Sequence, residues 1–179
     1  MEERILEVPV KNYYLKMNMK PEVEFDRSDA PDFTFQRLAT PISTEDYLFF
    51  YRTVGEAYNW HDRLLLGESD LYRVINSLKT EIFIYSVSHN VAGFAEFVRE
   101  SEYTEILYFG LFPDYIGKRY GKSFLQTVIN EAWHKGSKWI QLNTCELDHL
   151  NALPTYLKLG FELDKVVIEN RKVKQLGEF

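Results

Sequence analysis

The chain has 179 residues, of which 45% are hydrophobic and 27% charged, and its formal net charge is −6. This length and composition fit one globular domain and exclude a disordered or low-complexity chain. The negative charge argues against a nucleic-acid partner, because binding along a phosphate backbone needs a basic face.

The single cysteine, Cys145, excludes an internal disulfide and fits a reducing compartment. The N-terminal residues contain no uninterrupted apolar segment typical of a signal peptide, and no segment approaches the length of a membrane span. We therefore expect a cytoplasmic protein without a membrane partner.

The first 32 residues have an uneven pattern. Residues 5–15 alternate like an edge strand, whereas residues 20–32 are polar and interrupted by Pro21 and Pro31. We expect residues 1–32 to form an N-terminal extension that packs on a single domain, residues 33–179.

The domain begins with a strand and two helices. Residues 33–40 alternate with period two, as a half-buried strand does. One helix beginning at Ser43 or Thr44 and another beginning at Ser69 place apolar side chains at helical spacing. These side chains are Tyr47, Phe50, Tyr51, Val54 and Tyr58 in the first helix and Leu71, Val74, Ile75 and Leu78 in the second.

A hairpin and a further strand follow these helices. Residues 81–88 and 91–98 are rich in β-formers and are separated by the turn residues His89 and Asn90. Residues 105–112 are almost continuously apolar, which predicts a strand buried on both faces.

The rest of the chain alternates helix and strand. An apolar stripe of Leu125, Val128, Ile129 and Ala132 predicts a helix, which Gly136 ends. A strand over residues 139–145, a helix over residues 149–160 and a strand over residues 161–169 follow. This order predicts an α/β (α+β) fold whose sheet is antiparallel in its first part and contains a βαβ crossover in its second half.

The sequence FPDYIGKRYGKSFL, residues 112–125, joins the apolar strand to the next helix. It nearly matches a P-loop, in which a glycine is followed by four residues and then by Gly-Lys-Ser/Thr. Ile116 stands where the first glycine of that motif belongs, and isoleucine cannot adopt positive φ at glycine's low cost. A P-loop nucleotide-binding protein is therefore a remote alternative.

The same segment fits an anion site at a helix N-terminus. The free N–H groups of the first helical turn and the positive end of the helix dipole attract a phosphate. Gly117 and Gly121 would let the backbone approach a pyrophosphate closely. Lys118, Arg119 and Lys122 would add positive charge around it.

This segment resembles the acetyl-CoA pyrophosphate loop of the GCN5-related N-acetyltransferases. PDYIGKRYGK aligns without a gap with that loop, which is usually written Pro-Glu-Tyr-Arg-Gly-Lys-Gly-Ile-Gly-Lys. Gly121 matches the second glycine of the loop core, Arg/Gln-x-x-Gly-x-Gly/Ala. Ile116 replaces the Arg or Gln of that core, and Arg119 replaces its first glycine.

A second segment carries the same resemblance. In NALPTYLKLGFE, the spacing of Tyr156 from Gly160 and Phe161 is similar to that of the family's closing helix, and Ala152 matches its small residue one turn earlier. His149 stands where the family usually has an asparagine; the alternative for this stretch is helix capping by the preceding Asp148. The resemblance spans about residues 33–169.

The resemblance implies a mixed, mostly antiparallel sheet of about six or seven strands flanked by about four helices. It also implies a cleft where the fourth strand of that fold splays from the fifth, and Gly110 suits such an irregularity. Acetyl-CoA would bind there as a co-substrate, whereas the four scattered histidines give no metal-ligand spacing. The cofactor-binding residues that the resemblance implies are Phe109, Gly110, Leu111, Ile116, Gly117, Lys118, Arg119, Tyr120, Gly121, Lys122, Ser123 and His149.

Acetyl transfer to an amine requires a neutral amine, so a base or a water relay must remove the proton of an ammonium ion. By resemblance to the histone-acetyltransferase members, Glu105 is the candidate base, and burial would raise its pKa. An exposed glutamate at the start of a strand is the alternative, and Glu96 is the second candidate base. By the same resemblance, Tyr156 would donate a proton to the departing CoA thiolate.

The acceptor pocket of the family lies where residues 58–68 fall in this chain. Trp60, Asp62 and Arg63 are candidate substrate contacts in this stretch, and Glu96 is a further candidate. A solvated loop is the alternative for this stretch.

We expect an acetyl-CoA-dependent N-acetyltransferase that moves an acetyl group to a primary amine by direct attack in a ternary complex. The partner would be a small-molecule or peptide amine, and members of this family often form homodimers. Cys145 has no sequence signature for a base partner, so no acyl-enzyme is expected. The alternative from another class is a catalytically idle module that binds CoA or acyl-CoA, which the altered loop core favours.

Overall fold

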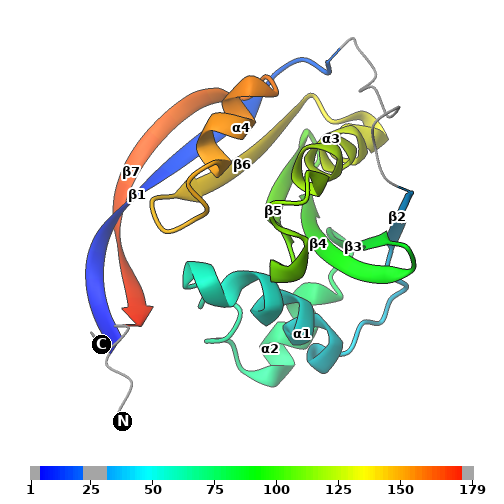
Figure 1. The fold of residues 1–179 in the computed structure, drawn as a ribbon. Coiled ribbons are helices and arrows are strands. Elements are labelled where there is room, and N and C mark those ends of the chain that lie inside the picture. Colours follow the sequence, from blue (N-terminus) through cyan, green and yellow to red (C-terminus); the bar gives the residue numbers. More distant parts are fainter. Residues whose placement is uncertain (1–4, 22–31, 175–179) are drawn as a thin grey trace.

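Figure 1 shows the computed structural model, which describes residues 5–21 and 32–174. Within these residues, seven strands form one sheet in the order β2-β3-β4-β5-β6-β1-β7. The strands are β1 (Ile5–Met17), β2 (Phe33–Arg37), β3 (Thr80–Val87), β4 (Asn90–Arg99), β5 (Tyr103–Leu111), β6 (Trp139–Cys145) and β7 (Glu162–Lys174). The α-helices are α1 (Thr44–Gly55), α2 (Glu68–Ile75), α3 (Tyr120–Ala132) and α4 (Ala152–Lys158).

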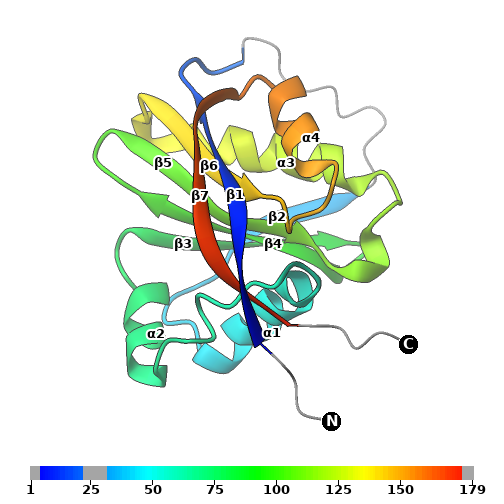
Figure 2. The ribbon, with the colours of Figure 1, turned by 90° about the vertical axis from the view of Figure 1, so that its left-hand side faces the viewer.

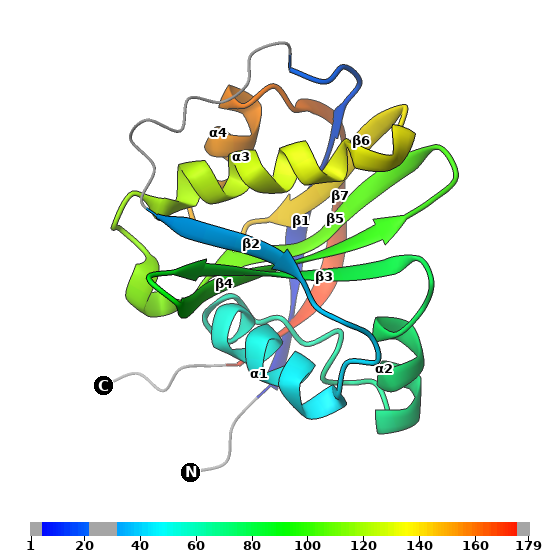
Figure 3. The same cartoon turned by 90° about the vertical axis from the view of Figure 1, so that its right-hand side faces the viewer.

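The helices cover both faces of the sheet (Figure 3). α1 and α2 pack on one face through a buried cluster that includes Tyr47, Tyr51 and Leu71. α3 packs on the other face through Phe124 and Val128, and α4 lies on that same side. The apolar stripe of each helix therefore determines which face it covers.

Within the described residues, none of the helices has the length and apolar character needed to cross a membrane.

β5 and β6 are the parallel neighbours in this sheet. The chain leaves β5, forms α3 and returns as β6, and the two strands pair from Tyr103↔Trp139 to Ile106↔Leu142. The other neighbouring strands pair antiparallel. The mostly antiparallel sheet and the βαβ crossover expected from the sequence are thus confirmed.

β1 is a sheet strand and not part of an extension lying over the domain (Figure 2). Residues 12–17 pair with β6 on one side, and residues 5–16 pair with β7 on the other. The edge-strand prediction is therefore wrong for the second half of β1. Alternation with period two shows that one face is solvated and does not distinguish an inner strand from an edge strand. Pro9, which has no N–H to donate, lies in the first half of β1, where the strand pairs with β7 alone.

Residues 22–31 of the expected extension lie outside the described residues.

Two local predictions also need correction. The hairpin between β3 and β4 turns at Ser88 and His89, whose φ values are 48° and 67°, and not at His89 and Asn90. Two-residue hairpin turns of this kind require positive φ at both central residues. Leu78 is fully exposed because α2 ends at Ile75.

Two glycines let β4, β5 and α1 approach one another closely. A Cβ atom on Gly93 would lie 2.5 Å from the carbonyl oxygen of Gly110 in the neighbouring strand. A Cβ atom on Gly110 would lie 2.2 Å from Cγ1 of Val54 in α1. Side chains at these positions would force the layers apart, so both glycines serve packing.

We expect Gly93→Ala to lower the free energy of unfolding by about 1–3 kcal/mol, because overpacking against backbone cannot be relieved by a rotamer change. Gly67→Ala is the matched control, since a Cβ at Gly67 meets no atom within 4 Å. That control should lower the free energy of unfolding by less than about 1 kcal/mol, a loss that comes only from the preference for glycine over alanine at the N-cap of α2. Urea unfolding measures both variants, and equal stabilities would contradict the close approach of β4 to β5.

Candidate active site

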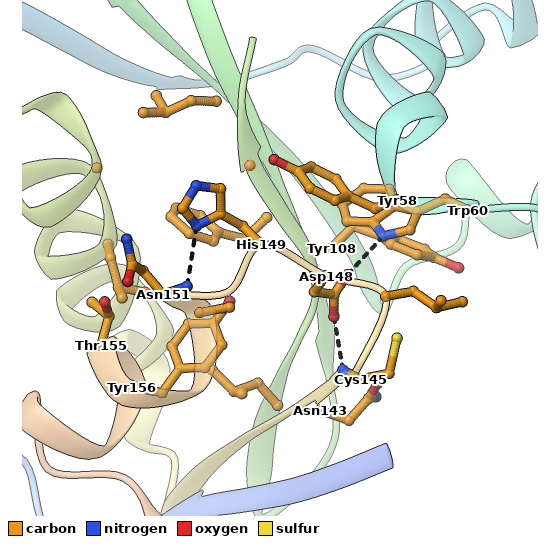
Figure 4. A pocket seen from close by; sticks show the side chains of 18 of the residues that line it. Tyr58, Trp60, Tyr108, Asn143, Cys145, Asp148, His149, Asn151, Thr155 and Tyr156 are labelled. Atoms are coloured by element: carbon orange, nitrogen blue, oxygen red, sulfur yellow. Dashed lines mark hydrogen bonds between the residues drawn. The ribbon is translucent and has the colours of Figure 1, made fainter. Parts of the chain in front are cut away.

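A pocket of about 520 Å³ lies where β5 and β6 separate (Figure 4). Its walls come from both strands, the loop before α3, the start of α4 and the loop between α1 and α2. The first turns of α3, the loop between β6 and α4, Asn12 of β1 and Arg171 of β7 also line it. This volume is typical of pockets that bind small molecules.

The separation of β5 from β6 creates the pocket. Their pairing ends at Ile106↔Leu142, although β5 continues to Leu111 and β6 to Cys145. β5 also carries a bulge at Leu107, where its register with β4 shifts, and a bulge bends a strand. Residues 107–111 are half-buried and line the pocket, so the prediction that this strand is buried on both faces is wrong here.

The loop before α3 forms a basic end of the pocket. Gly117 has a φ of 79° and Arg119 a φ of 68°, both in the left-handed region. α3 begins at Tyr120 without a side-chain cap on its first-turn N–H groups. Gly121 and Lys122 line the pocket together with Gly117 and Arg119. Free amides, the positive end of a helix dipole and two basic side chains can together hold an anion.

Tyr156 of α4 lies across the pocket from Trp60 and Tyr108 (Figure 4). Burial, and then the negative charge of Asp148, raise the pKa of Tyr156 above its usual value. Its ring packs edge-on against Phe161, with 6.1 Å between the centroids. Tyr156 is therefore a positioned hydroxyl that keeps its proton at neutral pH and can donate it.

Asp148 connects the end of β6 to the loop between α1 and α2. Its Oδ2 accepts hydrogen bonds from the Thr144 hydroxyl and the Cys145 N–H, both at 2.8 Å. Its Oδ1 accepts a hydrogen bond from the indole N–H of Trp60 at 3.3 Å. The carboxylate is thus not the cap of α4, which begins further along the chain with Asn151 at its N-cap.

Comparison with known proteins assigns the family. The model of the acetyltransferase (GNAT) family matches residues 43–161, which is more than half of the chain. The chain belongs to this family. No curated protein matches the sequence significantly.

Several solved structures resemble the fold of this chain. A GCN5-related N-acetyltransferase from Sphaerobacter thermophilus has a TM-score of 0.65 at 13% identity, over 94% of this chain and 53% of that chain. A conserved protein of unknown function from Staphylococcus epidermidis has a TM-score of 0.60 at 17% identity, over 95% of this chain and 64% of that chain. An aminoglycoside acetyltransferase from an uncultured soil metagenomic sample, solved with trehalose, has a TM-score of 0.56 at 13% identity, over 74% of this chain and 89% of that chain. This chain thus spans less than two thirds of the length of the first two, and these identities show a shared fold alone.

Most of the site residues expected from the sequence line the pocket of this GNAT family member. They are Trp60, Phe109, Gly110, Leu111, Ile116, Gly117, Arg119, Gly121, Lys122, His149 and Tyr156. His149 accepts the N–H of Asn151 at Nδ1, at 3.2 Å. In the neutral ring this leaves Nε2 as a donor.

Three of the expected cofactor-binding residues lie off the pocket lining. The Lys118 Nζ lies 5.9 Å from the centre of the Tyr115 ring, and Tyr120 packs against the same ring. The hydroxyl of Ser123 donates a hydrogen bond to the carbonyl of Tyr120 at 3.0 Å, within the first turn of α3. A continuous loop motif places consecutive side chains on different sides, so its members cannot all contact one ligand.

Glu105 lies just outside the pocket. It is paired with Gln141 in the part where β5 and β6 are still joined, and the lining begins at Ile106. Burial raises the pKa of Glu105, while a hydrogen bond with the Gln141 side chain lowers it. The pKa shift has the expected direction, but the structure does not bring this carboxylate into the pocket.

Glu96 is fully buried and does not line the pocket either. It accepts a hydrogen bond from the Tyr47 hydroxyl at 2.6 Å and forms an ion pair with Arg63. Burial raises the pKa of Glu96 against the opposing effect of Arg63. The Arg63 guanidinium lies 5.4 Å from the centre of the Tyr108 ring. Glu96 thus holds Arg63 against the Tyr108 ring. This position corrects the expected role of Glu96 as a substrate contact.

Sequence reasoning missed Asn12 and Arg171. They lie near opposite ends of the chain, on β1 and β7, and only sheet pairing brings them together. Nη2 of Arg171 donates a hydrogen bond to Oδ1 of Asn12 at 3.2 Å. No local motif marks either residue, whereas Tyr108 could have been found from its place in a predicted strand beside the phosphate loop.

Because the backbone of Arg119 is left-handed, we predict that glycine stabilises this position more than alanine does. This is the reverse of the preference inside a helix. We expect Arg119→Gly to be more stable than Arg119→Ala by about 1–2 kcal/mol, because residues with a Cβ are strained at positive φ. The same two substitutions at Gln126, inside α3, are the control, and there alanine should be favoured by about 0.5–1 kcal/mol. Urea unfolding reports both differences, and an alanine preference at residue 119 would contradict this loop conformation.

Proposed function

We propose that this acetyltransferase uses acetyl-CoA to acetylate a primary amine by direct attack in a ternary complex. One observation carries the proposal: a single pocket runs from the basic loop before α3 to the aromatic side chains beyond the separated strands. Direct transfer needs both substrates side by side in one space. The pocket offers chemically different ends for the two.

The basic end fits a pyrophosphate. Gly117 has open space where a Cβ would lie, and a Cβ on Gly121 would meet only Leu111, at 3.8 Å. Ligand phosphates can therefore approach the backbone closely. The first-turn amides of α3 would donate hydrogen bonds, and Arg119 and Lys122 would supply positive charge.

The edge of β5 that faces away from β4 fits the amides of a pantetheine arm. Beyond the Ile106↔Leu142 pair, β5 and β6 share no further pairing in the described residues. An extended chain with amide groups can add to such an edge as another strand would. Residues 109–111, which line the pocket, would make these contacts.

The other wall fits the chemistry of transfer. Bound acetyl-CoA would supply a thioester whose acyl carbon the amine attacks. Tyr156, which lines the pocket, would donate the proton of its hydroxyl to the departing sulfur as the C–S bond breaks. Burial raises the pKa of the Cys145 thiol, which disfavours the nucleophilic thiolate and supports direct attack over an acyl-enzyme.

A water relay fits the removal of the amine's proton best. Glu105 and Glu96 do not line the pocket, and both oxygens of Asp148 already accept hydrogen bonds. Asp148 is thus engaged in holding Trp60 and the end of β6. Water at the open side of the pocket can carry the proton to solvent.

The carboxylates that line the pocket already have hydrogen-bond or ion-pair partners, so none is an obvious base. This favours a second candidate, a module that binds CoA or acyl-CoA without turnover. Among the described lining residues, the carboxylates are Asp62 and Asp148, and each already has partners. Such a module would keep the phosphate-binding end of the pocket and would lack catalytic groups at the other end. Turnover separates the two candidates.

We expect Tyr156→Phe to bind acetyl-CoA with a dissociation constant close to that of the original protein and to lower kcat about 100-fold on amines, because the proton donor is lost. Calorimetry measures binding, and release of free CoA thiol measures turnover. Tyr103→Phe is the matched control, because Tyr103 stacks on Trp139 and does not line the pocket.

Undetectable binding at millimolar acetyl-CoA would overturn the proposal. Binding without turnover on a broad amine panel would instead support the idle module. Equal kcat values for Tyr156→Phe and Tyr103→Phe would remove Tyr156 from its assigned role.

A further inference from the structure

Arg171 stands out among the charged residues of the pocket. It lies on β7 opposite Val8 of β1, in the part of this strand pair that extends beyond β6. Its side chain lines the pocket and is 33% exposed. Arg119 and Lys122 belong to the phosphate end, so Arg171 is the cation at the end where the acceptor would enter.

The guanidinium of Arg171 is loosely held. Its partners are Oδ1 of Asn12 at 3.2 Å, Oδ2 of Asp62 at 3.4 Å and Oε2 of Glu169 at 3.4 Å. Charge-assisted hydrogen bonds between arginine and carboxylate are ordinarily about 2.7–2.9 Å long. Its Nε–H is buried and has no hydrogen-bond partner in the part of the chain that the structure describes.

Arg99 shows what a structural arginine looks like in the same protein. Its guanidinium is bonded to the Glu81 carboxylate at 2.7 Å, to the Thr104 hydroxyl at 3.0 Å and to the carbonyl of Ala132 at 3.0 Å. Its side chain is 11% exposed. Arg171 instead makes longer hydrogen bonds to its partners, and its side chain lines the pocket.

Asp62 is the exchangeable partner of Arg171. Its side chain is 62% exposed, and exposed ion pairs at such distances contribute little stability. A ligand carboxylate that took the place of Asp62 on Arg171 would release Asp62, whose negative charge could then attract a cation. A ligand that brings both an ammonium and a carboxylate satisfies both side chains and leaves the local charge unchanged.

We propose that the acceptor of this acetyltransferase is a small molecule that carries a carboxylate close to its amine, as an amino acid does. Arg171 binds the carboxylate, and Asp62 attracts the ammonium group before it loses its proton. The aromatic side chains of Tyr58, Trp60 and Tyr108 wall this end and favour an apolar or aromatic remainder. The inference rests on the proposed function, since it names the substrate class of that site.

The test compares matched acceptors that differ only in the carboxylate. L-phenylalanine and phenethylamine share the amine and the ring, and L-leucine and isoamylamine form a second pair. We expect kcat/KM to be about 10–100-fold higher for the amino acid of each pair, since a hydrogen bond to a charged group is worth about that factor.

Arg171→Met should reduce this ratio of kcat/KM values about tenfold or more, mainly through KM, and Arg171→Lys should retain part of it because lysine keeps the charge without the planar fork. Lys172→Met is the matched control, because Lys172 is exposed and does not line the pocket. Its ratio should equal that of the original protein. Circular dichroism and calorimetric binding of acetyl-CoA confirm that each variant is folded.

The outcomes test the acceptor inference and the proposed function separately. Equal or better turnover of the amines than of the amino acids, or a preference that survives in Arg171→Met, overturns the inference while leaving the acetyltransferase reaction intact. An original protein that binds acetyl-CoA and acetylates no amino acid of the panel also overturns it. Failure to bind acetyl-CoA overturns the proposed function itself.

Discussion

The pocket depends on the separation of two neighbouring parallel strands. β5 and β6 pair over four positions, from Tyr103↔Trp139 to Ile106↔Leu142, and then diverge. Backbone groups along a free strand edge require partners, so this geometry provides a surface that an extended ligand can complete. The bulge at Leu107 bends β5, and the close packing of Gly110 on Val54 holds the strand against α1.

The separated strands also determine where the remaining groups lie. The chain leaves β5 at the open end, so the basic loop and the N-terminus of α3 lie beside the opening. The end of β6 carries Asp148, whose hydrogen bond from Trp60 connects it to the loop between α1 and α2. The β1 and β7 strands, joined to β6, bring Arg171 to the far side of the same space.

The sequence allowed most of the fold to be predicted, because hydrophobic period and turn residues act locally. It also located the loop before α3 and Tyr156, since both belong to short segments of regular spacing. What it could not predict depends on pairing between distant segments. The sequence of β1 is typical of an edge strand, and only its pairing with a second strand shows otherwise. In the sequence, Arg171 cannot be distinguished from an ordinary surface cation. Glu105 was misplaced because the position at which β5 and β6 part, one residue further along, has no sequence signal.

In the proposed function, the free edge of β5 and the amides before and within the first turn of α3 together form the binding surface for acetyl-CoA. Hydrogen–deuterium exchange with and without acetyl-CoA tests it most directly, because exchange reports on individual segments of backbone. We expect slower exchange on binding at residues 109–111 and 117–122, and little change in β2 and β3. Slower exchange confined to other segments, or none at these two, would contradict it.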